Sequence, residues 1–191
     1  LERPYTTIQA CVNNAVGDKW VYVKEGNAIY AETVTLANNV TLWGAGHSGG
    51  FAGIPTTGAP VVDGSGADVM TLANNNTVMG FTIQNGSRGI YGIDIQNVIT
   101  GANTIQGNYI GIAADGATAV ANSIGIRVYE SSGVTIGGTT AGSRNIISGN
   151  STDGVLVIGA AATNNQIIGN YIGTDASGTL ARGNGRFGVL I

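Results

Sequence analysis

Short apolar runs, separated by glycine, asparagine and threonine, recur along the whole chain. The clearest run, Thr104-Ile-Gln-Gly-Asn-Tyr-Ile-Gly111, returns 62 residues further on as Gln166-Ile-Ile-Gly-Asn-Tyr-Ile-Gly173. Weaker copies lie at 77–83 and 144–148. Each strong copy holds two apolar runs joined by a Gly-Asn bend, and these two residues tolerate positive φ best. Repetition at this spacing indicates a chain wound into coils rather than a hairpin meander.

The apolar runs sort into three sets, one for each strand of a coil. First-face strands are expected to start near Val34, Val69, Ile93, Ile126, Val155 and Val189. Second-face strands are expected at 40–42, 78–79, 104–105, 134–136 and 166–168. Third-face strands are expected at 61–62, 82–83, 109–110, 146–147 and 171–172. Because stacked coils share one core, the sequence predicts a single all-β domain over residues 1–191, a parallel β-helix of about six three-strand coils over residues 20–191.

An amphipathic helix is expected over residues 6–16, ahead of the coils. Its apolar positions follow helical spacing and are Ile8, Cys11, Val12, Ala15 and Val16. Thr6 or Thr7 can cap its first turn, and Gly17 can end it. The sequence therefore predicts an N-terminal helix that caps the coil stack, with Cys11 packed on the apolar face.

The bends between second-face and third-face strands are expected to fall into one row. That row contains Phe81, Asn108, Asn145 and Asn170. Stacked asparagine amides can hydrogen-bond from coil to coil and satisfy polar groups that a bend would leave bare. We expect Asn108, Asn145 and Asn170 to form a structural ladder with Asn145 in the middle.

Three longer segments interrupt the coil pattern, at 43–60, 112–123 and 174–186. All three are expected to follow third-face strands, with turns at Asp115-Gly116 and at 175–178. In solenoids such insertions gather on one side of the rod, which is often the side that binds other molecules.

Charge, hydropathy and cysteine content indicate which kinds of molecule the protein binds and where it is located. The formal net charge is −3, with two lysines in 191 residues, whereas nucleic-acid-binding proteins usually present a basic face. No apolar stretch reaches the length of about 18 residues that a membrane span needs. A single cysteine excludes an internal disulfide, and this usage fits a secreted bacterial protein. The chain opens on Leu1-Glu2 without a signal peptide, so we expect a trimmed piece of a longer repeat protein.

Two regions resemble the pectin-lyase-like right-handed parallel β-helix superfamily. The opening, Tyr5-Thr-Thr-Ile-Gln-Ala10 with Val21-Tyr-Val23 and Tyr30-Ala-Glu32, is similar to the helix-capped start of secreted β-helices, pectinesterases among them. Later runs resemble repeat arrays in large bacterial surface proteins: Val134-Thr-Ile-Gly-Gly-Thr139, Arg144-Asn-Ile-Ile-Ser-Gly-Asn150 and Gly169-Asn-Tyr-Ile-Gly-Thr-Asp175. The resemblance implies a right-handed, single-stranded parallel β-helix outside the cell or on its surface.

The enzyme motifs of that superfamily are missing from the sequence. It contains no Asp-Phe-Ile-Phe-Gly-like run of pectinesterases, no Asn-Thr-Asp or Gly-His-Gly run of polygalacturonases, and no Asp-Pro-His run of alginate epimerases. We therefore expect a non-catalytic module: a surface stalk, an adhesin or a filament-forming structural protein, with polysaccharide as a candidate ligand. The alternative is a polysaccharide lyase, esterase or epimerase.

In the superfamily the first face commonly carries the substrate cleft, so its outward residues are the candidates for catalysis. This outward row is expected to contain Thr35, Thr71, Asp94, Arg127, Leu156 and Leu190. Asp94 and Arg127 are expected in register one coil apart, with Tyr91, Tyr129, Glu130 and Asp153 nearby. An arginine beside a carboxylate could bind a sugar acid or assist proton abstraction. The competing interpretation is an exposed cross-strand ion pair, and the two leucines of the row disfavour a polar cleft.

The candidates for contact with a sugar are Trp43, His47, Tyr91 and Tyr129. Trp43 and His47 open the longest loop, although Trp43 could instead pack on the coil below. Asp63 and Asp68 are the remaining candidates for a Ca²⁺ site. Hard cations need several oxygen ligands and no Asp-x-Asp run occurs, so we expect neither a metal nor another cofactor.

The two ends of the predicted rod differ. The helix over 6–16 covers one end, whereas Ile191 lies on a first-face strand, midway through a coil. Exposed strand edges recruit other strands, and repeat arrays need polar caps to stay soluble. We expect the C-terminal end either to meet further coils of the same chain or to stack copies end to end into a filament.

Overall fold

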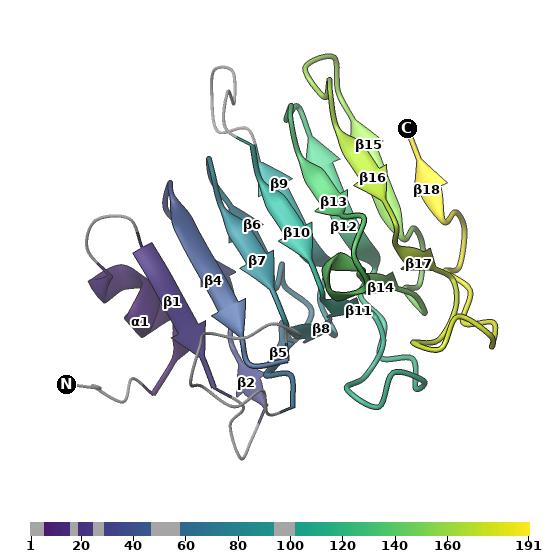
Figure 1. Ribbon diagram of the computed structural model, residues 1–191, viewed down its shortest axis with the longest axis horizontal. Coiled ribbons are helices and arrows are strands. Elements are labelled where there is room, and N and C mark those ends of the chain that lie inside the picture. Colours follow the sequence, from purple (N-terminus) through teal and green to yellow (C-terminus); the bar gives the residue numbers. More distant parts are fainter. Residues whose placement is uncertain (1–5, 16–18, 25–28, 47–57, 94–101) are drawn as a thin grey trace.

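The computed structural model describes residues 6–15, 19–24, 29–46, 58–93 and 102–191, and for residues 91–93 only the backbone. Within these residues the chain forms three parallel sheets of six strands each, one α-helix and one short 3-10 helix, η1 (Ala141–Ser143). Figure 1 shows the strands stacked side by side along the long axis of the molecule. The predicted parallel β-helix is confirmed.

Each sheet takes one strand from every coil. The second-face sheet contains β1 (Lys19–Val23), β4 (Val40–Gly44), β7 (Thr77–Met79), β10 (Thr104–Gln106), β13 (Thr135–Gly137) and β16 (Gln166–Ile168). The third-face sheet contains β2 (Tyr30–Ala31), β5 (Val61–Asp63), β8 (Thr82–Gln84), β11 (Tyr109–Ile110), β14 (Ile146–Ile147) and β17 (Tyr171–Ile172). The first-face sheet contains β3 (Val34–Thr35), β6 (Met70–Leu72), β9 (Arg88–Ile93), β12 (Ile124–Tyr129), β15 (Val155–Ile158) and β18 (Val189–Leu190). The first coil is therefore β1–β3, the sixth is β16–β18, and the six predicted coils are present.

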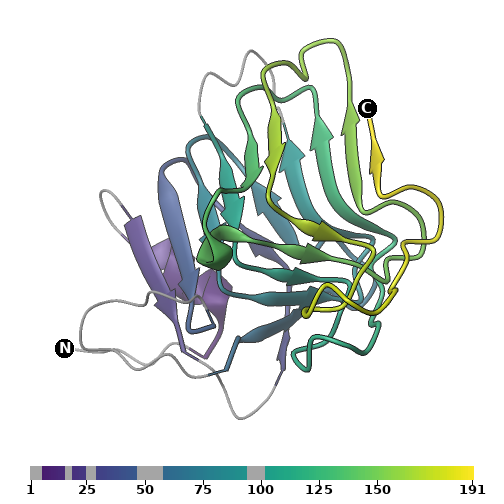
Figure 2. The ribbon, with the colours of Figure 1, turned by 45° about the vertical axis from the view of Figure 1, so that its right-hand side comes forward.

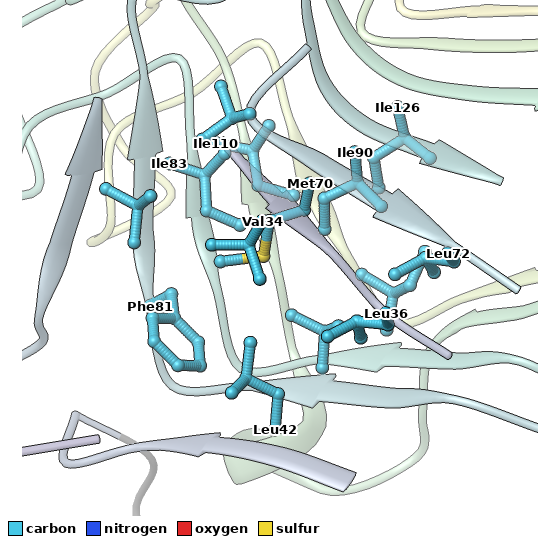
Figure 3. Close-up of a cluster of buried hydrophobic side chains, with 14 of the residues drawn as sticks. Val34, Leu36, Leu42, Met70, Leu72, Phe81, Ile83, Ile90, Ile110 and Ile126 are labelled. Carbon is cyan, nitrogen blue, oxygen red and sulfur yellow. The ribbon is translucent and has the colours of Figure 1, made fainter. Parts of the chain in front are cut away.

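Side chains alternate between the core and the surface along the strands. In the third-face sheet the inward column is 0 % exposed at Val62, Ile83, Ile110 and Ile147. Branched side chains suit this column because they pack well on a pleated surface. Figure 3 shows Val34, Leu42 and Ile83, one from each sheet, in a single cluster between the sheets. One apolar core therefore runs along the stack and holds the coils together.

The expected first-face strand near Ile93 is wrong. The strand of the third coil, β9, begins at Arg88, and Ile90 pairs with both Met70 and Ile126 in the core column. Tertiary contacts decide this register, because the backbone N–H of Gly86 donates to Asn122 Oδ1 at 2.9 Å and fixes the corner just before the strand. The prediction near Ile93 relies on the apolar alternation of Ile93 and Ile95, which follows this strand start in the sequence.

The position predicted for the segment 43–60 is also wrong. This segment connects β4 of the second-face sheet to β5 of the third-face sheet, and Trp43 belongs to β4 itself. The expected strands at 40–42 and 61–62 already placed this segment between the second and third faces, and the structure agrees with those strands rather than with the expected loop position. The segments after β11 and β17 do follow third-face strands, as predicted.

The predicted N-terminal helix is confirmed as α1 (Ile8–Asn14). Thr7 is its N-cap, and the Thr7 hydroxyl oxygen accepts from the backbone N–H of Ala10 at 3.1 Å. Ile8 and Val12 are buried against the coils, whereas Cys11 is half-buried and burial raises the pKa of its thiol. No helix in the described part of the chain is long and apolar enough to cross a membrane.

Two side chains attach α1 to the first coil. The Glu32 carboxylate accepts from the backbone N–H groups of Ile8 and Gln9, at 2.8 and 3.0 Å. A carboxylate is favourable at this position because the N-terminus of a helix carries partial positive charge. The Gln9 amide exchanges two hydrogen bonds with the backbone of Thr35, at 2.6 and 3.2 Å, in the way that a neighbouring strand would. The helix therefore covers part of the edge that the first coil would otherwise expose.

Candidate functional site

The predicted asparagine ladder is present at the corner between the second-face and third-face sheets. Asn108 Nδ2 donates to Asn145 Oδ1 at 3.1 Å, and Asn145 Nδ2 donates to Asn170 Oδ1 at 2.9 Å. The backbone N–H groups of Phe81, Asn108 and Asn145 donate to the Oδ1 of the asparagine in the following coil. Asn145 is 0 % exposed and lies in the middle of the ladder, as predicted.

A second asparagine ladder, which was not predicted, lies at the corner between the third-face and first-face sheets. Asn122 Nδ2 donates to Asn150 Oδ1 at 3.2 Å, and Asn150 Nδ2 donates to Asn184 Oδ1 at 2.9 Å. The sequence did carry a signal for it, because Asn122 and Asn184 have the same 62-residue separation as the two strongest copies of the repeat.

The third corner carries a shorter version of the same arrangement. The backbone N–H of Asn76 donates to Asn103 Oδ1 at 2.8 Å, and the backbone N–H of Val134 donates to Asn165 Oδ1 at 2.9 Å. Buried backbone donors at a corner have no strand partner, so a side-chain oxygen from the next coil must satisfy them. Asparagine therefore serves the same purpose at all three corners, although Val134 stands in its place at the third corner of the fifth coil.

In these rows the backbone N–H donates to an asparagine of the next coil, toward the C-terminal end of the stack. Each asparagine Nδ2 in the two longer ladders also donates in the opposite direction, to a carbonyl oxygen of an earlier coil, as Asn170 does to Ile136 at 2.8 Å. At the third corner one backbone N–H, that of Asn74, also donates backward, to Asn38 Oδ1 at 3.0 Å. In the sixth coil the rows end at Asn165, Asn170 and Asn184. Among the described residues, no hydrogen bond uses the backbone N–H of any of these three. Three donors thus remain at the three corners of the last coil.

The apolar interior of the sixth coil is also uncovered. Val189 is 39 % exposed, whereas Val155, its partner in the fifth coil, is 0 % exposed. Ile172 is likewise half-buried, whereas its partner Ile147 is fully buried. We call this surface the open end and define it by six residues of the last coil: Asn165, Ile167, Asn170, Ile172, Asn184 and Val189.

An ion pair joins the fifth and sixth coils beside the open end. Arg186 Nε donates to Asp153 Oδ1 at 3.0 Å, and Arg186 Nη2 also contacts Asp153 Oδ2. The hydrogen bonds from Arg186 hold the pKa of the Asp153 carboxyl below its usual range, although burial opposes the shift. Asp68 and Arg88 form a similar pair between the second and third coils. Both pairs bind one coil to the next.

The predicted register between Asp94 and Arg127 is wrong. Arg127 pairs with Tyr91 in the coil before it and with Leu156 in the coil after it, and Asp94 lies outside the described residues. The guanidinium of Arg127 lies 5.0 Å from the centre of the Tyr129 ring, a cation–π distance. The side chain of Tyr91 is not described, so only the strand position of this candidate is known.

The carboxylates expected near Arg127 have other partners. Glu130 accepts a hydrogen bond from the backbone N–H of Ala161 at 2.8 Å. Asp153 is 0 % exposed and bound to Arg186. Within the described part of the first-face sheet, the structure therefore does not gather acid and base groups around Arg127.

Two tryptophans lie together on the outer surface of the second-face sheet. The rings of Trp20 and Trp43 are 6.1 Å apart between centroids and inclined by 38°. Trp20 is 59 % exposed, whereas Trp43 is half-buried. Trp20 begins an outward row that continues with Thr41, Thr77, Thr104, Thr135 and Gln166. His47, the other candidate from this region, lies outside the described residues.

The two aspartates considered for Ca²⁺ already have protein partners. The Asp63 carboxylate accepts from the backbone N–H of Ser65 and from the amides of Gln84 and Asn85, at 2.9–3.3 Å. Burial raises the pKa of Asp63, but these hydrogen bonds outweigh it and lower the pKa overall. Asp68 binds Arg88. In the described residues no three carboxylate, histidine or cysteine side chains come close enough together to hold a metal ion.

Comparison of this chain with protein-family models, with curated proteins and with solved structures finds no match.

Proposed function

We propose that this chain is a non-catalytic structural module of an extracellular or cell-surface protein, and that its open end binds further β-helical coils. The single observation that carries the proposal is the contrast between the fifth and sixth coils. Val155 is 0 % exposed and Val189 is 39 % exposed at equivalent positions. Apolar side chains and unpaired strand edges are normally covered, so a partner that covers them is expected.

The distribution of polar groups supports a structural role over a catalytic one. The asparagine side chains of the two longer ladders form hydrogen bonds between coils, and the two aspartate–arginine pairs also join neighbouring coils. The lyase, esterase or epimerase alternative needs a reactive group beside Arg127, and Glu130 and Asp153 are bound elsewhere. Turnover of polygalacturonate or alginate that disappears in Arg127→Ala would reverse this proposal.

The chain's similarity to repeat arrays of the pectin-lyase-like superfamily supports the same proposal. Such arrays use stacked coils as rigid, extended scaffolds. The net charge of −3 and the single cysteine are compatible with a location outside the cell. The proposal is thus a scaffold that extends by adding coils, located in or on a bacterial cell envelope.

The two ends limit how copies of this chain can associate. A fibre of identical copies needs two complementary ends. Here α1, Glu32 and Gln9 occupy the first coil, so a second copy meets a helix there rather than a bare strand edge. Further coils, or two open ends placed together, fit the uncovered surface better than a filament of repeated copies.

Light scattering combined with hydrogen exchange tests the proposal. We expect mass to rise with concentration toward a dimer through the open ends, and we expect Val189→Lys to keep the chain monomeric. Amide protons at Asn165, Asn170 and Asn184 should exchange faster than those at Asn108 and Asn145. A monomer at all concentrations, with equally slow exchange in the last coil, would show that the open end needs no partner.

A second candidate function, carbohydrate binding, is favoured by the two tryptophans. Exposed aromatic rings offer large flat apolar surfaces, and the adjoining row of threonines offers hydroxyl groups. We expect Trp20→Ala to weaken retention of the chain on immobilised polysaccharide, with Phe187→Ala, which removes an exposed aromatic ring away from the tryptophans, as the control. Equal retention of both variants and the parent chain would remove this candidate.

A further inference from the structure

Two similar hairpins project from alternate coils. The first follows β11 in the fourth coil and is closed by an antiparallel bridge between Ile112 and Ala119. The second follows β17 in the sixth coil and is closed by the bridge between Thr174 and Ala181. The bridges lie 62 residues apart, and the fifth coil has no such hairpin after β14. Both hairpins project from the same side of the stack (Figures 1 and 2).

Each hairpin is built around an aspartate and a glycine with positive φ. Asp115 accepts from the backbone N–H groups of Ala117 and Thr118, both at 2.8 Å, and Gly116 has φ of +69°. Asp175 accepts from Thr179 at 3.1 Å, and Gly178 has φ of +76°. These bonds shape each tip locally, so the tips keep their form without a neighbour.

The two tips meet directly across the fifth coil. The backbone N–H of Ala176 donates to the carbonyl oxygen of Gly116 at 2.8 Å. Arg182 Nε donates to the carbonyl oxygen of Ala117 at 2.6 Å. Neighbouring coils are about 4.8 Å apart, so hairpins two coils apart make contact only because no hairpin lies between them.

The fifth coil is adapted to pass beneath this contact. Gly149 occupies the place where a hairpin would begin, and its backbone N–H donates to Arg182 at 2.9 Å. A Cβ atom at Gly149 would lie 2.8 Å from the Cβ of Ala119 and 2.9 Å from the carbonyl oxygen of Gly111. This level of the stack therefore has no room for a larger residue, and still less for a hairpin.

The second hairpin repeats the acceptors of the first on its outer side. Gly178 and Thr179 lie 62 residues after Gly116 and Ala117, whose carbonyl oxygens accept the contacts between the tips. In the described part of the chain no hydrogen bond reaches the carbonyl oxygen of Gly178 or of Thr179. Leu180 on the same hairpin is 54 % exposed. The hairpin column thus ends in an unused acceptor surface beside the open end.

We infer that the open end is a docking surface for a two-coil β-helical unit with this same 62-residue pattern. The coil of that unit that contacts the open end is the one without a hairpin. The interface already present between the fourth, fifth and sixth coils carries the inference, because the open end and the second hairpin continue that interface. The first coil of an incoming unit would bring the equivalents of Asn145 and Asn150 to the backbone N–H groups of Asn170 and Asn184, as the fifth coil does for Asn108 and Asn122. The second coil of that unit would bring a hairpin donor to Gly178. The inference rests on the proposed function, since it specifies which coils the open end accepts.

Two extended chains of identical composition test this inference. Leu190 pairs with Leu156, and Leu156 pairs with Arg127, so Ile191 occupies the same strand position as Val157 and Val128. Residue 158 or residue 129 can therefore follow Ile191 in register. The in-phase extension adds a second copy of residues 129–191 after Ile191, which places a hairpin-free coil first. The out-of-phase extension adds residues 158–191 and then 129–157, which places a hairpin directly against the hairpin of the sixth coil.

We expect the in-phase extension to raise the midpoint of thermal unfolding by about 5 °C or more, because each added interface stabilises a repeat array. The out-of-phase extension should gain less than half of this shift, with fast amide exchange at Ala176 and in its added coils. Equal stabilisation by both extensions would overturn the pairing rule and leave the proposed stacking intact. No stabilisation by either extension would overturn the proposed stacking as well.

Discussion

The two ends of the coil stack are treated differently, although they are made of the same repeating strands. At the first coil, Gln9 pairs with the edge of β3 and Glu32 holds the N-terminus of α1. At the sixth coil, Val189 is 39 % exposed, and no hydrogen bond among the described residues uses the backbone N–H of Asn170 or of Asn184. The two ends of the stack are therefore not equivalent. At one end the Gln9 side chain takes the place of a neighbouring strand. The other end presents apolar side chains and backbone N–H groups of the kinds that contact the next coil elsewhere in the stack.

The difference between the ends also shows where stability resides in such a stack. An inner coil is covered on both sides, and its inward residues and corner amides are fully buried. The last coil is covered on one side only, so the same residue types should contribute less there. Equivalent substitutions in the fifth and sixth coils measure this directly, since the two coils share register.

The largest effect is expected in the inward column of the third-face sheet. Ile147→Ala removes a fully buried side chain and should lower the free energy of unfolding by about 2–5 kcal/mol. Ile172→Ala removes the equivalent, half-buried side chain of the next coil and should cost less than half as much. Urea unfolding of the two variants checks the comparison. Equal losses would mean that the last coil is covered by a partner.

A smaller effect is expected in the asparagine ladder. Asn145→Leu leaves the N–H groups of Asn108 without their acceptor and should lower the free energy of unfolding by about 1–3 kcal/mol. Asn170→Leu, at the half-buried end of the ladder, should cost less because water can reach the groups left unpaired. Thermal unfolding measures both variants. If Asn145→Leu melts like the parent chain, the ladder does not stabilise the corner.

At the closed end, Glu32→Gln should lower the free energy of unfolding by about 0.5–1 kcal/mol, because a charge at the helix N-terminus is lost. Glu130→Gln is the matched control, since it also removes a carboxylate that accepts a backbone N–H but does so away from any helix. Circular dichroism during urea unfolding follows both. A larger loss in the control would contradict the role given to Glu32.

The smallest effect concerns pH and the ion pair beside the open end. The folded-state pKa of Asp153 is below its ordinary value, so its contribution to stability is present above that ordinary value. It is lost as the pH falls through the lowered folded-state pKa. Asp153→Asn should therefore show a shallower loss of stability than the parent chain below about pH 4. Unfolding midpoints measured from pH 6 to pH 2 check this, and parallel curves would contradict it.

The sequence by itself determined the architecture and the most regular spacing within it. The 62-residue return of the Gly-Asn bend predicted three-strand coils and the ladder of Asn108, Asn145 and Asn170. The helical spacing of apolar residues over 6–16 predicted the capping helix. These features follow from short-range patterns. A bend residue, an apolar pair and a helical period each occupy only a few neighbouring positions, so they can be recognised before the chain is folded.

Tertiary structure alone decided the register of β9, the contact between the two hairpins and the bonds from Glu32 and Gln9 that attach α1 to the first coil. The corner bond from Gly86 to Asn122 shifted β9 away from the stronger apolar alternation that follows it. The contact between Ala176 and Gly116 joins positions 60 residues apart, across a coil that lacks a hairpin. Such contacts depend on which coils lie side by side, and a pattern of a few neighbouring residues does not contain that information. The sequence therefore predicts the strands and bends of each coil, whereas the stacking of the coils determines which residues of other coils they contact.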